Sequence, residues 1–302
     1  MFLFETDTKA ILYTGDFRIS LKNLENIKQL KELRNHDNVV IYMDSTFFKK
    51  SFSTFPTQTE SVQKIIELVD SWIKKSKLHK GKKVILKMRD FKKSCIFLVH
   101  LKVPARYGYE YLLMELNKTL KQGIYIPEAK VYEQYLTISN LDNCVTNDAL
   151  SQIILTPKYL STIPEKQKDE LVLTLQLSAW FWTNWNEKKP FVSSINANSI
   201  RVCYATHCSY NELKAFLVFL KPTKVFLNVI PTNSDEKREM MQELQNIQKL
   251  YIDKPKYKIP EEITTNSSCF KRLLLDLSLN SKQSQKRQKE STLLQSILDD
   301  SF

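Results

Sequence analysis

LYTGDFR, at residues 12–18, joins an apolar segment to a glycine and an aspartate. The apolar pattern predicts a short strand over Ala10–Tyr13, with a hairpin partner at Met1–Phe4. Asp16 then follows the carboxyl end of a strand, the place where open α/β sheets present side chains to ligands. The motif is compatible with a metal-binding aspartate and with an ordinary loop aspartate.

Two further residues repeat this position at a strand end. Asp44 directly follows the apolar segment NVVIYM, which predicts a buried strand over Asn38–Tyr42. Parallel strands deliver their carboxyl ends to one edge, so Asp16 and Asp44 are expected to share a site. His207 follows a predicted strand at Arg201–Ala205, and either binds a metal or an anion or is a structural turn histidine.

Strand and helix patterns alternate along the rest of the chain. Thr57 and Glu60 form a capping box for a helix over Glu60–Lys75, and Ser209 with Glu212 forms another before an apolar helix that ends at Pro222. Other helices are predicted over Leu21–Leu33 and Tyr109–Gln122, and strands over Lys83–Lys87, Ile153–Leu155, Leu171–Leu177, Ser199–Tyr204 and Lys224–Ile230.

Composition argues against nucleotide-binding loops, a disulfide framework and a transmembrane helix. The 302 residues carry 42% hydrophobic side chains and only four glycines, and they contain no GxGxxG or GxxxxGK pattern for cradling nucleotide phosphates. The five cysteines are scattered, which favours free thiols over a disulfide framework. No apolar run is long enough to predict a transmembrane helix.

The net charge of +12 favours a polyanionic partner. Lys74–Lys93 holds ten Lys and Arg residues and one acid, Asp90, so it is either a solvated helix end or a surface that follows phosphates. The aromatic segment Ser178–Trp185 is expected to be core or a turn lid. The candidate nucleic-acid-binding residues are Lys74, Lys75, Lys80, Lys82, Lys83, Ser209 and Tyr210.

Met88–Leu101 interrupts this pattern. Its last residues continue as VHLK and repeat the preceding VILK, so deleting residues 88–101 would leave a continuous strand. We expect an insertion there, and the alternative is a lengthened hairpin. From about Ile259 the chain turns polar and includes KQSQKRQKES, so the tail is expected to be largely disordered.

Taken in order, LYTGDFR, VIYMDSTF, ARYGYEYLLMEL, CYATHCSYNELKAFLVFLKP and NVIP resemble the metallo-β-lactamase/β-CASP nucleases of DNA repair. The resemblance covers about Met1 to Pro231. It implies an α/β fold: an incomplete αββα metallo-β-lactamase sandwich with an inserted α/β β-CASP subdomain. The implied segments are 1–50 in the sandwich, 51–198 as the β-CASP subdomain with the 88–101 insertion, 199–256 returning to the sandwich, and 257–302 as tail.

The resemblance also implies a chemistry, metal-dependent phosphodiester hydrolysis by a 5′ exonuclease or hairpin-opening endonuclease. Asp16 matches the family's metal-bridging aspartate, Asp44 a catalytic acid near the scissile phosphate, and His207 a second metal-binding residue. The implied cofactor is a divalent metal of the zinc or magnesium type. The implied setting is double-strand-break repair by end joining and cross-link repair in the nucleus. The implied partners are DNA ends, hairpins, 5′-phosphorylated single strands and end-joining proteins, with no membrane.

The departures from the family are equally specific. The HxHxDH cluster that supplies most metal ligands is absent from these residues, and we expect it to belong N-terminal to residue 1. A truncated chain of this kind is expected to retain no metal tightly, to be inactive alone, and to expose a sheet edge or apolar patch. A family histidine is replaced in QIIL at Gln152–Leu155, and residues 145–202 contain neither His nor Cys for a structural zinc. Two alternatives stay open: a non-catalytic DNA- or partner-binding fragment, and a β-CASP nuclease that processes RNA.

Overall fold

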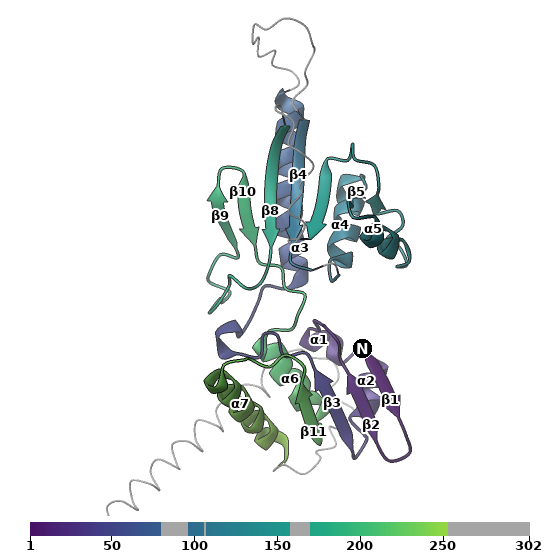
Figure 1. Cartoon of the computed structure of the whole chain (residues 1–302), viewed down its shortest axis with the longest axis vertical. Coiled ribbons are helices and arrows are strands. Elements are labelled where there is room, and N and C mark those ends of the chain that lie inside the picture. Colours follow the sequence, from purple (N-terminus) through teal and green to yellow (C-terminus); the bar gives the residue numbers. More distant parts are fainter. Residues whose placement is uncertain (80–95, 106, 158–169, 253–302) are drawn as a thin grey trace, which may run out of the picture. The chain divides into compact units, whose positions relative to one another are not determined.

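The computed structural model describes residues 1–79, 96–105, 107–157 and 170–252, which divide into two compact units (Figure 1). The first unit combines Met1–Phe48 with Asn211–Phe302, and the second is Lys49–Tyr210. The return to the first unit therefore falls at Asn211 and not at Ser199, because residues 199–202 pair within the sheet of the second unit. Within the described ranges, no helix combines the length and apolarity that a bilayer crossing requires.

The first unit contains a four-stranded sheet in the order β1-β2-β3-β11. β1 pairs antiparallel with β2, whereas β2, β3 and β11 are mutually parallel. Their carboxyl ends therefore lie at the same edge of the sheet. The strands span Phe2–Glu5, Ala10–Tyr13, Val39–Met43 and Lys224–Leu227, which confirms the four strands predicted for this unit.

Helices cover one face of this sheet (Figure 1). The covered face carries Leu12, Ile41 and Met43, which are all buried. The ring of Phe17, just after β2, lies 5.1 Å from that of Phe216 on α6, which fixes this helix against the strand ends. The helices are α1 (Leu21–Leu24), α2 (Lys28–Leu33), α6 (Tyr210–Leu220) and α7 (Ser234–Ile252).

Two helix predictions need correction here. The single helix expected over Leu21–Leu33 is two short helices, because Ile27 adopts an extended backbone between them. Helix α7 was not predicted at all. Its first turn carries Asp235 and Glu236, and its buried stripe is Leu244, Ile247 and Tyr251, so the helical spacing was available in the sequence.

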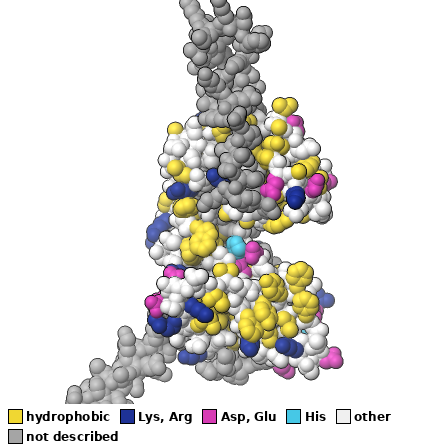
Figure 2. All heavy atoms as spheres, viewed as in Figure 1, with side chains coloured by type: hydrophobic (Ala, Val, Ile, Leu, Met, Phe, Trp, Pro, Cys, Tyr) yellow, Lys and Arg dark blue, Asp and Glu magenta, His cyan; other side chains and the backbone are white. Residues whose placement is uncertain are grey.

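The other face of the four-stranded sheet is open and aromatic. The register aligns Phe2 with Tyr13, Tyr13 with Tyr42, and Tyr42 with Phe226, so one aromatic row crosses all four strands. These side chains are 67%, 43%, 36% and 37% exposed, and hydrophobic side chains gather over this sheet in Figure 2. The exposed apolar patch expected from the sequence is therefore present.

The second unit contains a seven-stranded sheet in the order β6-β5-β7-β4-β8-β10-β9. Every paired neighbour is parallel except β9 and β10. The strands are β4 (Ile96–Val103), β5 (Ile124–Tyr125), β6 (Val145–Thr146), β7 (Ile153–Pro157), β8 (Glu170–Leu177), β9 (Val192–Asn196) and β10 (Ser199–Val202). β5, β6 and β9 are short or polar and had no clear sequence pattern.

Helix α3 (Gln58–His79) packs on β4 and on α4 (Glu110–Leu120). Its predicted capping box is confirmed: the Thr57 N–H donates to Glu60 Oε2 at 2.8 Å, and the Glu60 N–H donates to Thr57 Oγ1 at 3.1 Å. A one-turn helix η1 (Lys50–Phe52) precedes α3, and α5 (Ala129–Leu136) follows β5. Helices α3, α4 and α5 contribute to one core that includes the buried Ile65 and Leu112.

The expected insertion needs correction in the part that the structure describes. Residues 96–101 belong to β4, which pairs with β7 on one side and β8 on the other. Its Val99, His100 and Leu101 are all buried, so this segment is part of the core and not an addition to it. The rest of that insertion, the strand predicted at Lys83–Lys87 and the 257–302 tail lie outside the described residues.

Candidate metal centre

Two aspartates converge at the carboxyl edge of the four-stranded sheet. Asp16 comes three residues after β2 and Asp44 comes directly after β3, and these strands are parallel with Tyr13 opposite Tyr42. One oxygen of each carboxylate lies within 4.8 Å of the other. The convergence predicted from the two strand ends is therefore observed.

The turn after β2 brings Asp16 to this edge. Gly15 has φ +57, a left-handed conformation that glycine adopts without steric cost. Thr14 is fully buried, and its hydroxyl donates to the Gly15 carbonyl at 2.7 Å. The Asp16 side chain is left exposed, so it is accessible to a soluble cation.

Asp44 is held much more rigidly. It is only 3% exposed, and its N–H donates to Thr14 Oγ1 at 2.9 Å, which links the two strand ends. Its Oδ1 accepts from the Thr46 N–H at 3.0 Å and from the Thr46 hydroxyl at 2.7 Å. Such bonds orient a carboxylate before any ligand arrives.

The third strand end is tied to the same edge. The Ser45 hydroxyl donates to the Val229 carbonyl at 2.7 Å, and the Val229 N–H donates back to Ser45 Oγ at 2.9 Å. Ser45 is fully buried, so these bonds fix the loop after β3 against the loop after β11. The rigid part of the site therefore involves the ends of β2, β3 and β11.

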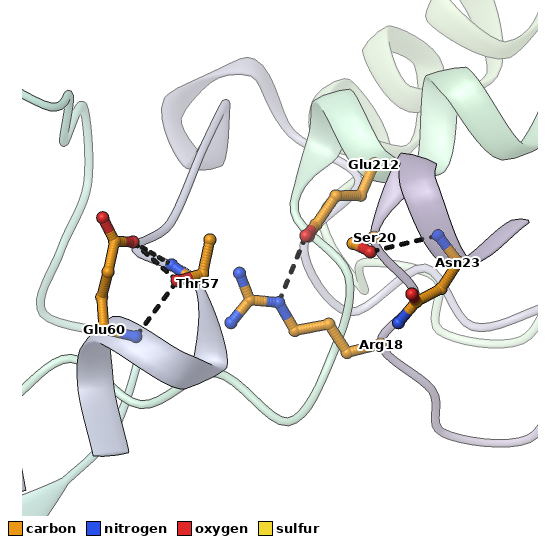
Figure 3. Close-up of polar contacts among 6 residues, drawn as sticks. All are labelled: Arg18, Ser20, Asn23, Thr57, Glu60 and Glu212. Carbon is orange, nitrogen blue, oxygen red and sulfur yellow. Dashed lines mark hydrogen bonds and ion pairs between the residues drawn. The ribbon is translucent and has the colours of Figure 1, made fainter. Parts of the chain in front are cut away.

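Arg18 and Glu212 form a further contact that sequence reasoning missed (Figure 3). Arg18 Nε lies 3.3 Å from Glu212 Oε1, and the two side chains are only 6% and 19% exposed. This ion pair ties the loop that carries Asp16 to the first turn of α6. Both residues stood in the quoted motifs, but a pairing across 194 positions leaves no local signal. Capping of α6 by Ser209 stays a prediction.

The remaining predicted site residues belong to the second unit. His207 lies in the loop between β10 and α6, and its side chain is partly exposed. Ser209 and Tyr210 are 2% and 5% exposed, so a direct contact of their side chains with nucleic acid stays a prediction. Within the described part of the chain, the sheet edge thus unites Asp16 and Asp44 in one unit, and His207 belongs to the other.

The predicted basic surface is described only at its start. Lys74 and Lys75 are exposed near the end of α3, and Lys74 Nζ lies 2.6 Å from Asp70 Oδ2. An exposed pair of this kind is screened by solvent and stabilises the helix little. Lys80, Lys82 and Lys83 lie outside the described residues.

Two carboxylates so close together at a sheet edge are a suitable partial ligand set for a divalent cation. Carboxylate oxygens bind magnesium- and manganese-type ions, and zinc also accepts them beside histidine. A cation also offsets the repulsion between two like charges at this distance. The donor set therefore fits the metal that the sequence resemblance implies.

Comparisons with known proteins find similar sequences among DNA-repair proteins. Residues 145–233 match the profile of the family described as DNA repair metallo-beta-lactamase. Protein artemis of Homo sapiens is 27% identical over 273 residues, which cover 85% of this chain and 36% of that protein. Protein artemis of Danio rerio is 28% identical over 244 residues, covering 76% of this chain and 35% of that protein. The chain thus spans about a third of the length of these relatives.

Proposed function

We propose that this chain supplies part of the active site and the DNA-binding surface of a metal-dependent DNA nuclease. The basis is that the chain belongs to the DNA repair metallo-β-lactamase family and is Artemis-like. The observation that carries the proposal is the convergence of Asp16 and Asp44 within 4.8 Å at a sheet edge. A divalent metal held at this edge would activate a water molecule and neutralise charge on the phosphate. The proposed setting is end joining and cross-link repair in the nucleus.

Each residue has a proposed task. Asp16, exposed after the Gly15 turn, is the metal-bridging ligand. Asp44, oriented by Thr46, lies beside the scissile phosphate and a second metal position. Thr46 is a positioning residue, because it acts only through the Asp44 carboxylate.

His207 is proposed as a further ligand, and the support is its short separation along the chain from a residue near Asp16. Glu212 follows His207 by five positions along the chain, and its carboxylate pairs with Arg18, which lies two positions after Asp16. Five residues extend at most about 17 Å, so the imidazole is tethered to the Asp16 loop. Asp16, Asp44 and His207 offer three protein ligands in all, fewer than three for each ion of a two-metal site. We therefore expect weak metal binding and no turnover by this chain alone.

Paramagnetic line broadening tests the proposed ligands without requiring activity. With the 302-residue chain in Mn²⁺, we expect the amide signals of residues near Asp16, Asp44 and His207 to broaden first. Asp16→Asn is expected to abolish the effect, and Thr46→Val to weaken it by about tenfold or more, as loss of an outer-shell partner does. Asp7→Asn, an exposed aspartate in the β1–β2 turn, is the matched control. Broadening that survives Asp16→Asn would remove the proposed site.

A cleavage assay separates the proposal from its alternatives. We expect no metal-dependent cleavage of 5′-phosphorylated single strands or DNA hairpins by this chain, although it binds both. Robust cleavage that Asp16→Asn abolishes would contradict the expected inactivity while supporting the nuclease site. Preference for structured RNA over DNA would favour the RNA-processing alternative. DNA binding without Mn²⁺ broadening would favour the non-catalytic alternative.

A further inference from the structure

The loop after β8 places two large aromatic side chains in solvent. Trp180 is 56% exposed and Phe181 is 54% exposed, although they belong to a segment whose Trp185 is buried. Aromatic side chains lose much favourable burial when they are exposed side by side, so a pair in this state often marks a binding surface. These two residues are therefore not core, and the turn-lid alternative from the sequence stays a prediction.

Their place in the sheet also favours a ligand. β8 lies beside β4 and parallel to it, so the loop after β8 is at the carboxyl edge of the seven-stranded sheet. From β4 the chain first builds β5, β6 and β7 on one side, and it then crosses to β8 on the other side. Open parallel sheets bind ligands outside the carboxyl ends of strands where the strand order reverses in this way.

Arg201 on β10 gives the aromatic pair a cationic partner. Its guanidinium carbon lies 4.2 Å from the centroid of the Phe181 ring, in cation–π contact. Its Nε is buried and has no hydrogen-bond partner among the described residues. A guanidinium stacked in this way braces the ring and presents planar donors suited to a phosphate or a base edge.

The tryptophan is held from the other side. Its ring meets that of Phe52 edge-on at 5.6 Å, and the backbone N–H of Trp180 donates to Ser178 Oγ at 3.3 Å. Phe52 ends η1, and the exposed Lys49 and Lys50 lie three and two positions before it along the chain. Exposed aromatic rings bordered by cations are the elements of a single-strand binding surface, where bases stack and phosphates meet positive charge.

We propose that Trp180, Phe181 and Arg201 form a base-stacking platform for single-stranded nucleic acid. The platform deepens the proposed nuclease function, on which it rests, by giving the unpaired strand at a DNA end its own binding residues. Charge selects this occupant over an apolar protein segment, because the chain carries +12 and the flanking Lys49, Lys50 and Arg201 are all cationic. Stacking of this kind is tolerant of base sequence, because every base has an aromatic face.

Fluorescence anisotropy with a labelled single-stranded oligonucleotide tests the platform. We expect Trp180→Ala and Phe181→Ala each to weaken binding by about 5- to 100-fold, the range that loss of one stacked base produces. Trp180→Tyr should restore most of the affinity, since it keeps a stacking ring. Phe2→Ala is the matched control, because Phe2 is a still more exposed aromatic, at 67%, in the other unit, and should change affinity less than twofold.

An abasic oligonucleotide of equal length separates stacking from charge. It keeps the phosphates and lacks the bases, so the unaltered chain should bind it more weakly, and Trp180→Ala should weaken that binding no further. Equal losses on both oligonucleotides would overturn the stacking role. If the unaltered chain binds the normal oligonucleotide and both alanine variants bind it equally well, the platform is wrong and the proposed function stands. If the unaltered chain binds neither single strands nor duplexes, both are wrong.

Discussion

The two sheets of this chain differ in which of their faces are buried. In the central strand β4 of the second unit, the consecutive residues Val99, His100 and Leu101 are all buried, so side chains on both faces are covered. In β3 of the first unit, Ile41 is buried while its neighbour Tyr42 is 36% exposed. Parallel strands normally have both faces covered. The first sheet therefore has the strand pairing of a buried sheet and the exposure of an open one.

The difference shows that strand pairing sets the register of a sheet, whereas packing sets which of its faces are buried. The first sheet keeps its parallel register and its converging strand ends, although one face carries the exposed Phe2–Tyr13–Tyr42–Phe226 row. Helices on its other face suffice to position Asp16 and Asp44. The edge that carries the two aspartates thus depends on the covered face, and the other face is exposed.

A cavity in the covered sheet should have the largest effect on stability. Leu101 on β4 is fully buried, so Leu101→Ala is expected to lower the free energy of unfolding by about 2–5 kcal/mol. Truncation in the exposed aromatic row, by Phe2→Ala, should change the free energy of unfolding by less than about 0.5 kcal/mol. Urea unfolding of both variants makes the comparison. A comparable loss in the two variants would show that the open row is in fact packed.

Acid should destabilise the second unit through His100. Burial, and then the charge of Lys102, lowers the pKa of His100 to about 4 from an ordinary value near 6.5. His100 Nε2 shares a hydrogen bond with Thr156 Oγ1, and Nδ1 has no partner among the described residues, so the neutral ring is the form that fits. The unfolded chain then binds the proton more readily than the folded chain between pH 6.5 and 4.

This difference sets the direction of the pH effect. Stability should fall as pH drops below about 6.5 and level off near pH 4, with a total loss of about 3 kcal/mol from this group. Urea unfolding between pH 7 and 4 measures it. His100→Gln should flatten that dependence, whereas His36→Gln, at a partly exposed histidine 3.1 Å from Glu5 Oε1, should leave it in place. An unchanged slope in His100→Gln would assign the acid sensitivity to other groups.

Features with a local sequence signal could be predicted, whereas contacts between distant segments could not. Strand ends carry local signals, so Asp16, Asp44 and the capping box of Thr57 and Glu60 were found where the structure has them. The Arg18–Glu212 pair and the Arg201–Phe181 stack depend on contacts between distant segments, which no periodicity reveals. The repeated VILK and VHLK misled the interpretation of β4, because either copy has the pattern of a buried strand.

Charging the open row should change surface behaviour and leave stability nearly unaltered. Tyr42 stacks on Phe226 with ring centroids 4.7 Å apart, so Tyr42→Lys removes the centre of the row. We expect the binding of an apolar fluorescent dye to fall by about half, since an exposed apolar patch of this kind binds such dyes. The unfolding midpoint should move little. Dye binding that is unchanged would place the main apolar surface elsewhere on the chain.

The smallest expected effect concerns charge on the helix that covers the second sheet. Lys74 on α3 and Lys28 on α2 are matched, since each is exposed and pairs with an acid four residues away, at 2.6 Å and 3.6 Å. If the second unit carries the phosphate-binding surface, Lys74→Ala should reduce the slope of log affinity against log salt by about 1, and Lys28→Ala should not. Duplex binding between 50 and 200 mM salt, roughly the range over which such contacts are screened, measures both slopes. Equal slopes would move the DNA surface away from α3, whereas a reduction only in Lys74→Ala would assign DNA binding to the unit with the covered sheet.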